Sequence, residues 1–197
     1  MRRAALGLSL ALVLSWALIS PTAVRSEGSP PSFTADLTYD AIWGNVAPGS
    51  VVTVTRPADG AYGAAEADGV GFFWTPLWQP NGQPGNIADG GPLEIYVNGV
   101  LATTLSPEAI TGQVDVLNDQ VTGAIDGVAA GTGVTVTLAI DASVPGDYMP
   151  QVIATTDADG EFSADFGAAG YNLGPHNHAL VAVAANGHRV QGHVYPH

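Results

Sequence analysis

Apolar and polar residues alternate along the chain in short runs, and Gly or Pro residues separate these runs. The pattern is clearest in 52–55, 134–137 and 180–183. A period of two places successive side chains on opposite faces of a strand, and beyond residue 32 no run keeps the 3.6-residue period of an amphipathic helix. Short alternating runs between turn residues predict an all-β sandwich or barrel.

The same order of short motifs occurs twice in the chain. Gly44–Gly49 with Val52 and Val54 returns as Gly127–Gly131 with Val134 and Val136, Glu66–Gly69 before Phe72 returns as Asp157–Gly160 before Phe162, and Ile95–Gly99 returns as Val183–Gly187. The order is kept while the spacing between motifs varies by a few residues. Repetition of this kind predicts two similar structural units.

Two Asn-Gly pairs predict tight hairpins, because both central residues of a type I′ turn need a positive φ. A two-residue loop at Asn98-Gly99 predicts one face formed by Leu93, Ile95, Val97 and Val100. The same loop at Asn186-Gly187 predicts an apolar face formed by Val181, Val183, Val190 and Val194. Both hairpins therefore point equivalent positions toward a core.

These motifs resemble bacterial immunoglobulin-like repeats, and they are similar to carboxypeptidase-regulatory-like (transthyretin-like) modules, which share the Thr156–Phe162 element. The resemblance covers 35–197, and an inserted Trp/Gly/Pro-rich stretch at 74–92 departs from it. It implies two tandem immunoglobulin-like β-sandwich domains, 35–106 and 112–197, joined by a linker at 107–111. It also implies a non-catalytic spacer, adhesive unit or accessory domain of a secreted or surface protein.

The N-terminus reads as a secretory signal peptide over 1–26, followed by a Gly/Ser/Pro linker over 27–34. Arg2 and Arg3 precede an apolar stretch, and small residues stand near the expected cleavage position. The alternative is an uncleaved membrane anchor, although the apolar run is short for a span of roughly 20 residues. We expect a protein that is secreted or held at the cell surface, with no other membrane segment.

Acidic residues dominate the charge of the chain after this signal. Arg56 and Arg189 stand against 18 carboxylates, a net charge of −16, and lysine and cysteine are absent. Nucleic acid and anionic lipid are not expected as partners, since binding to either relies on many Lys and Arg side chains. The expected partners are extracellular or cell-surface proteins or glycans. The acid excess favours solubility or, alternatively, calcium binding.

Four histidines are predicted to share one face of the terminal hairpin: His176, His178, His193 and His197. His178 lies opposite Tyr195 in the predicted pairing, with His193 one diagonal step away and within reach. Imidazole binds zinc and copper, so this face is a candidate metal site. The alternative is a set of ordinary solvent-facing residues that gain charge between roughly pH 5 and 8.

Two further segments are candidates for binding. Asp157, Asp159 and Glu161 alternate through a turn that offers oxygen ligands for calcium, although it is not an EF-hand and normally forms only a turn in related modules. Trp74 and Trp78 precede the Gly/Pro-rich loop and are candidates for stacking on sugar rings.

No nucleophile elbow, phosphate loop or metalloprotease motif occurs in the sequence. We therefore expect no enzyme activity and no required cofactor. The leading hypothesis is a non-catalytic secreted or cell-surface structural or adhesive β-sandwich protein. The alternatives are a carbohydrate-binding module that uses the Trp-rich loop and an exported metal-binding protein that uses the histidine face.

Overall fold

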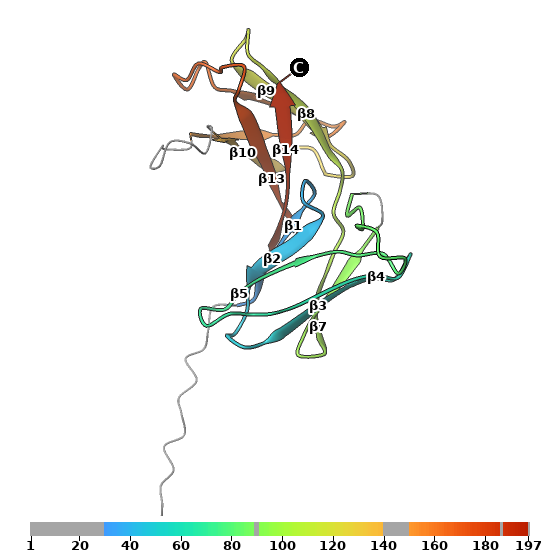
Figure 1. Ribbon diagram of the computed structural model, residues 1–197. Helices are drawn as coiled ribbons and strands as arrows, with labels where there is room; N and C mark the ends of the chain where they lie inside the picture. The colour runs from blue at the N-terminus through green and yellow to red at the C-terminus, as the bar shows by residue number, and fades with distance from the viewer. Residues whose placement is uncertain (1–29, 89–90, 140–149, 186, 197) are drawn as a thin grey trace, which may run out of the picture.

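Fourteen strands make up the elements of the computed structural model, which describes residues 30–88, 91–139, 150–185 and 187–196 (Figure 1). The first half holds β1 (Ser32–Asp36), β2 (Ala41–Asn45), β3 (Val51–Arg56), β4 (Ala61–Glu66), β5 (Phe72–Pro76), β6 (Leu93–Val97) and β7 (Val100–Leu105). The second half holds β8 (Ile110–Asp115), β9 (Gln120–Ile125), β10 (Gly133–Ala139), β11 (Gln151–Thr155), β12 (Glu161–Asp165), β13 (His178–Ala185) and β14 (His188–Pro196). The prediction of an all-β protein is confirmed.

One pattern of strand pairing occurs in both halves. In the first, β2 lies between β1 and β5, and a second layer runs β4-β3-β6-β7. In the second, β9 lies between β8 and β12, and the other layer runs β11-β10-β13-β14. The registers also match, because Val54 pairs with Ile95 as Val136 pairs with Val181.

Alternating aliphatic residues fill the space between the layers. Val52, Val54, Val134 and Val136 are fully buried, as are Ile95 and Val181 on the strands that pair with them. Burial of a side chain of this size contributes about 1.5–3 kcal/mol. The chain contains no cysteine, so burial of this kind, rather than disulfide bonds, stabilises the fold.

The predicted hairpin registers hold near both turns. Val183 pairs with Val190 and Ala179 with Val194, and the predicted face of Val181, Val183, Val190 and Val194 is buried. At the first hairpin Val97 pairs with Val100, and Asn98 and Gly99 have φ of 51° and 78°. Asn186 lies outside the described residues. The prediction of an inward-facing Val100 was wrong: it is 71% exposed, at the tip of an edge strand.

The equivalence of the Asp-Gly turns differs by two residues from the motif match. Asp68 corresponds to Asp157, because each Oδ1 accepts two backbone N–H groups in its turn. Gly71 then corresponds to Gly160, and both have a positive φ. A Cβ on either would collide with a carbonyl of the neighbouring strand end. The equivalent turn residues of the two halves are therefore identified by their backbone contacts and not by the local Asp-x-Asp-Gly sequence.

A strand of the first half joins the sheet of the second. β1 pairs in parallel with β14, with Thr34 opposite Arg189 and Asp36 opposite Gln191, so ten strands form one sheet across both halves. The buried Gln191 Nε2 donates to Asp36 Oδ2 at 2.7 Å, and Leu37 N donates to Gln191 O at 2.8 Å. The two halves therefore share backbone hydrogen bonds as well as a connecting segment.

This shared strand changes the predicted boundaries. β1 begins at Ser32, inside the segment 27–34 that the composition had assigned to a linker, because Ser32 pairs with Asn45 of β2. β8 begins at Ile110, inside the predicted linker 107–111, because Ile110 pairs with Ile125. The predicted signal peptide, 1–26, lies outside the described residues. Within the described ranges, no helix has the length and apolar character needed to cross a membrane.

Candidate ligand-binding surfaces

An aromatic patch lies on the outer face of the sheet of the first half. Trp74 on β5 pairs directly with Trp43 on β2, and the rings of Trp43 and Phe72 are 6.4 Å apart. Strand alternation turns Phe73, between Phe72 and Trp74, into the core, where it is 1% exposed. Phe72 and Trp74 are exposed on the opposite face of the strand.

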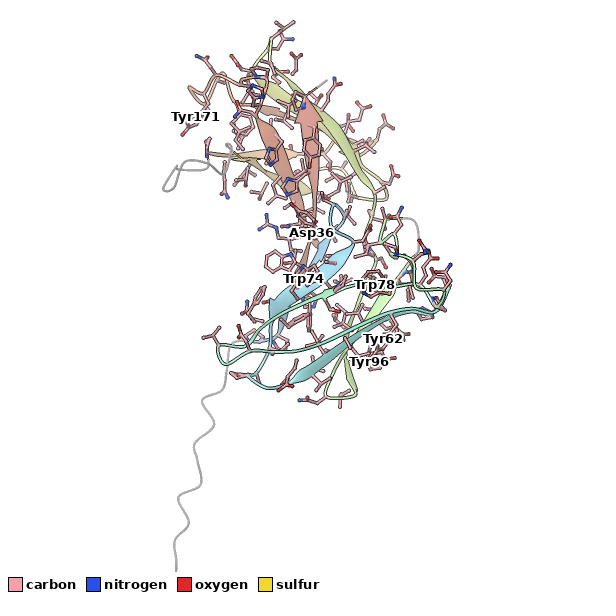
Figure 2. The ribbon with its side chains drawn as sticks, in the orientation of Figure 1. Asp36, Tyr62, Trp74, Trp78, Tyr96 and Tyr171 are labelled. Carbon is pink, nitrogen blue, oxygen red and sulfur yellow. The ribbon has the colours of Figure 1, made fainter. Side chains whose placement is uncertain are left out.

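Trp78 forms a separate site with Tyr62. The two residues exchange backbone hydrogen bonds of 2.7 and 2.9 Å, and both side chains are about half exposed. Between them lies an open groove of about 430 Å³, lined by Gly60, Tyr62, Gly63, Ala64, Thr75, Pro76, Trp78, Gln79 and Pro80. In Figure 2, Tyr62 and Trp78 lie on the lower lobe, whereas Trp74 lies toward the joint marked by Asp36. Trp74 does not line this groove.

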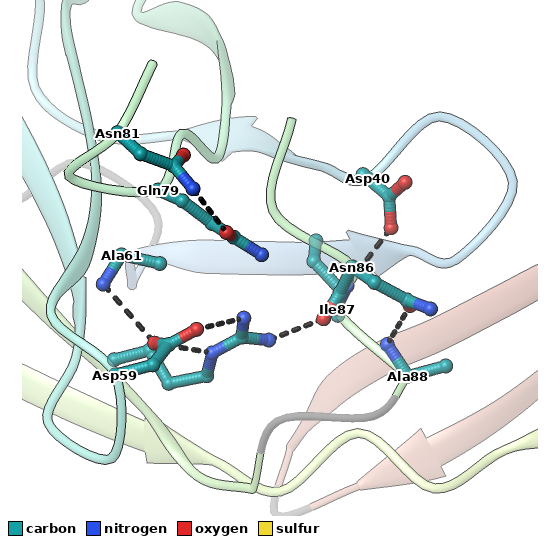
Figure 3. A network of polar contacts seen from close by, with 9 residues as sticks. Asp40, Asp59, Ala61, Gln79, Asn81, Asn86, Ile87 and Ala88 are labelled. Atoms are coloured by element: carbon teal, nitrogen blue, oxygen red, sulfur yellow. Dashed lines mark hydrogen bonds and ion pairs between the residues drawn. The ribbon is translucent and has the colours of Figure 1, made fainter. Parts of the chain in front are cut away.

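The loop after Trp78 is anchored by a buried arginine. The Arg56 side chain is 3% exposed; it forms an ion pair with Asp59 at 2.6 Å and donates to the Asn86 carbonyl (Figure 3). Asp40 Oδ1 accepts the Ile87 N–H at 2.8 Å, and Ile87 and Leu77 are fully buried. The hydrogen bonds from Arg56 lower the pKa of Asp59 to about 2. The insertion is therefore a fixed wall of the groove.

The predicted histidine face is present in part. The rings of His178 and His193 stack at 5.2 Å, and each also stacks with Tyr195. Tyr39, from the β1–β2 turn, meets the ring of His193 edge-on at 6.0 Å. Burial lowers the pKa of His193, and neighbouring His178 lowers it further, while Asp36 opposes both.

The metal prediction is not tested by this arrangement. His176 is exposed in the turn before β13, and His197 lies outside the described residues. Among the residues that the structure does describe, no group of three His, Cys, Asp or Glu side chains is close enough to hold a metal ion. Zinc or copper binding at His176, His178, His193 and His197 therefore stays a prediction.

Asp157 has a structural role in the candidate calcium turn. Its Oδ1 accepts the N–H groups of Asp159 and Glu161, each at 2.9 Å, and closes the turn before β12. The equivalent Asp68 makes the same two bonds at 2.9 Å, to Val70 and Phe72. One carboxylate oxygen is thus already used by the backbone, and calcium binding stays a prediction.

A larger shallow groove of about 1070 Å³ in the second half is lined by β8, β9 and β12 of one layer and by β11 of the other. Its lining is mostly small and polar: Thr111, Gly112, Gln113, Thr122, Gly123, Ala124, Ile153, Ala154, Thr155, Asp157, Glu161, Phe162 and Ser163. Asp157 and Glu161 stand at one margin of this groove. It lacks the exposed aromatic side chains of the groove beside Trp78.

Several surface residues were not predicted from the sequence. Trp43 becomes a partner of Trp74 only through the β2–β5 pairing, and Tyr62 meets Trp78 only across the edge of the sandwich. Tyr39 and Arg189 are brought to the joint by the β1–β14 pairing. The alternation of β2 and of β14 was a usable signal for the outward direction of Trp43 and Arg189, although not for their neighbours.

No protein-family model matches the chain, and a search of curated proteins finds no match. Among solved structures, it is similar to the crystal structure of a tetra-tandem repeat in the extending region of a large adhesion protein, with 19% sequence identity and a TM-score of 0.31. The match covers 83% of this chain and 48% of the other, so the chain spans about half the length of that structure. The description of the fold therefore rests on the strand pairing given above.

Proposed function

We propose that the chain is an exported, non-catalytic structural or adhesive protein, in which two immunoglobulin-like sandwiches act as one stiff spacer. The observation that carries this proposal is the parallel pairing of β1 with β14, which continues one sheet from the first half into the second. Hydrogen bonds between backbones hold two units at a fixed angle far better than a flexible linker does. The N-terminal signal pattern supports export.

The buried Asp36–Gln191 hydrogen bond offers a test of the stiff spacer. In Gln191→Ala, the buried Asp36 carboxylate loses one donor, and we expect a cost of about 1–3 kcal/mol at the joint. Small-angle scattering from residues 27–197 should fit one fixed arrangement for the wild type and a broader distribution for the variant. Gln151→Ala, on the exposed face of edge strand β11, is the control and should scatter like the wild type. If the scattering of the wild type fits only a broad distribution of angles between the two halves, the stiff spacer is refuted.

A second function, carbohydrate binding, is favoured by the groove between Tyr62 and Trp78. Two half-exposed aromatic rings beside Pro76 and Pro80 offer an apolar surface on which the C–H face of a sugar can stack. The anchoring of the loop by Arg56 limits the ordering cost of binding.

Trp78→Ala tests this second function. We expect a loss of affinity of about tenfold or more for any glycan that the wild type binds on an array, because the ring is a wall of the groove. Titration of the best glycan against wild type and variant measures the loss. Tyr171→Ala, at an exposed site of the second half, is the control. A flat array for the wild type, or equal binding by Trp78→Ala, would remove the groove as a sugar site.

A further inference from the structure

Arg189 occupies a distinctive place in the fold. It lies on β14 opposite Thr34 of β1, where the sheets of the two halves join, and it is half-buried. Its Nε is buried and has no hydrogen-bond partner among the described residues. A buried donor without a partner costs free energy, and no hydrogen bond at Nε offsets the partial burial of this charged side chain.

The nearest carboxylate does not satisfy this side chain. Asp36 lies two residues further along the same face, and its Oδ2 accepts the side-chain N–H of Gln191, while Oδ1 accepts the N–H groups of Thr38 and Tyr39. In the described part of the chain, the ion pair that the structure forms is between Arg56 and Asp59, at the far side of the first half. Arg189 is thus left with a charge attraction toward Asp36 and no direct ion pair.

Aromatic rings extend from Arg189 in one row across the sheet. The direct cross-strand partners run Arg189–Thr34–Trp43–Trp74, from β14 through β1 and β2 to β5. Strands lie about 4.8 Å apart, so Trp43 is about 10 Å from Arg189 between Cα atoms, and Trp74 is about 14 Å away. Directly paired residues share one face of the sheet. On this face Trp74 is 50% exposed, Arg189 and Trp43 are partly buried, and Thr34 is 6% exposed.

We propose that this row binds an acidic polysaccharide, with the carboxylate of a uronic acid on Arg189 and neighbouring sugar rings on Trp43 and Trp74. A guanidinium and a carboxylate form paired, charge-assisted hydrogen bonds. The C–H faces of pyranose rings stack on the exposed Trp74 and the partly exposed Trp43. The ligand then spans both halves, which are fixed to each other by β1.

The aromatic row favours a sugar over an acidic peptide. Two indole rings in one cross-strand row offer stacking surfaces for sugar rings, whereas a bound peptide strand uses pockets for alternate side chains. The strongly acidic chain also repels polyanions over long distances, so the contact depends on the one cation at close range. This site is separate from the Tyr62–Trp78 groove. It rests on the same β1–β14 pairing as the spacer proposal, which can hold even if no sugar binds.

The test is titration of residues 27–197 with oligogalacturonate and with its methyl ester. The wild type is expected to bind the acid and to bind the uncharged ester at least tenfold more weakly. Arg189→Gln should lose at least tenfold in affinity for the acid, and Arg189→Lys should recover part of the loss because it keeps the charge without the fork. Trp74→Ala should lower the affinity for both the acid and the ester. Trp78→Ala, a matched change in the other groove, should leave both affinities unchanged.

Three results would overturn the proposal. They are no binding of the acid by the wild type, equal binding of acid and ester, and equal binding by wild type and Arg189→Gln. Binding of a poly-glutamate peptide through Arg189 without binding of the oligogalacturonate would also reject the sugar. The comparison of acid with ester uses the wild type alone, so it stays decisive even where a variant folds poorly.

Discussion

Gly44→Ala is expected to destabilise the first half by about 3 kcal/mol or more. Gly44 lies in the middle strand of a layer, opposite Phe33 on β1 and Phe73 on β5, and it is buried. A Cβ at this position would overlap the backbone carbonyl of Ser32, which cannot rotate away as a side chain does. The start of β1 must then move, and this strand is the one that joins the two halves. Urea denaturation of residues 27–197 measures the loss.

Gly69→Ala is the matched control for this substitution. Gly69 is exposed in the turn before β5, and a Cβ there would meet nothing within 4 Å. The same change of residue should therefore alter the stability by no more than about 0.5 kcal/mol. Equal effects of the two substitutions would show that the close approach of β1 to β2 does not exist in solution.

Arg56→Met is expected to destabilise the protein by about 1–3 kcal/mol, since it removes the buried donor of the Asp59 and Asn86 contacts and keeps most of the volume. Asp59 and the Asn86 carbonyl lose their donor, and the loop after Trp78 loses its anchor. The pKa of Asp59 should rise from about 2 toward 3.8, so the stability that it contributes above pH 4 and loses toward pH 2 disappears. Urea denaturation and NMR titration of Asp59 measure these changes.

Arg56→Lys separates charge from geometry at this site. Lysine keeps the positive charge and lacks the planar fork that contacts Asp59 through two nitrogens, so we expect an intermediate loss. Faster proteolytic cleavage at 79–88 in Arg56→Met would report release of the loop. An Arg56→Met variant as stable as the wild type, with an unchanged pKa at Asp59, would contradict the anchoring role.

Local patterns in the sequence were enough to predict the strands and the hairpins. The alternation around Val181 and Val190 gave the buried face, and the Asn98-Gly99 pair gave the turn, because both depend on residues close in sequence. The prediction that Val100 faces the core was wrong, because the tip of an edge strand has no opposing layer. The register also shifts by one residue between Ile95 and Tyr96, at an irregularity that has no marker in the sequence.

The joint and most of the surface sites could not be predicted in the same way. The pairing of β1 with β14 joins residues more than 150 positions apart, and no alternation pattern specifies the partner of an edge strand. The same pairing places Arg189 in a row with Trp43 and Trp74. Alternation placed Phe73 and Trp74 on opposite faces without saying which face is buried. The separate groove at Trp78 depends on Tyr62, a residue of another strand.

Amide hydrogen exchange at Leu37 tests the joining of the two halves most directly, because its N–H donates across the joint to Gln191 O. If β1 is a full strand of the shared sheet, this amide should exchange only through global unfolding, with the same free energy as the amide of Val181 in the central hairpin. Exchange at Leu37 many-fold faster than at Val181 would mean that β1 separates from β14 in the folded protein, and the two halves would then be independent units.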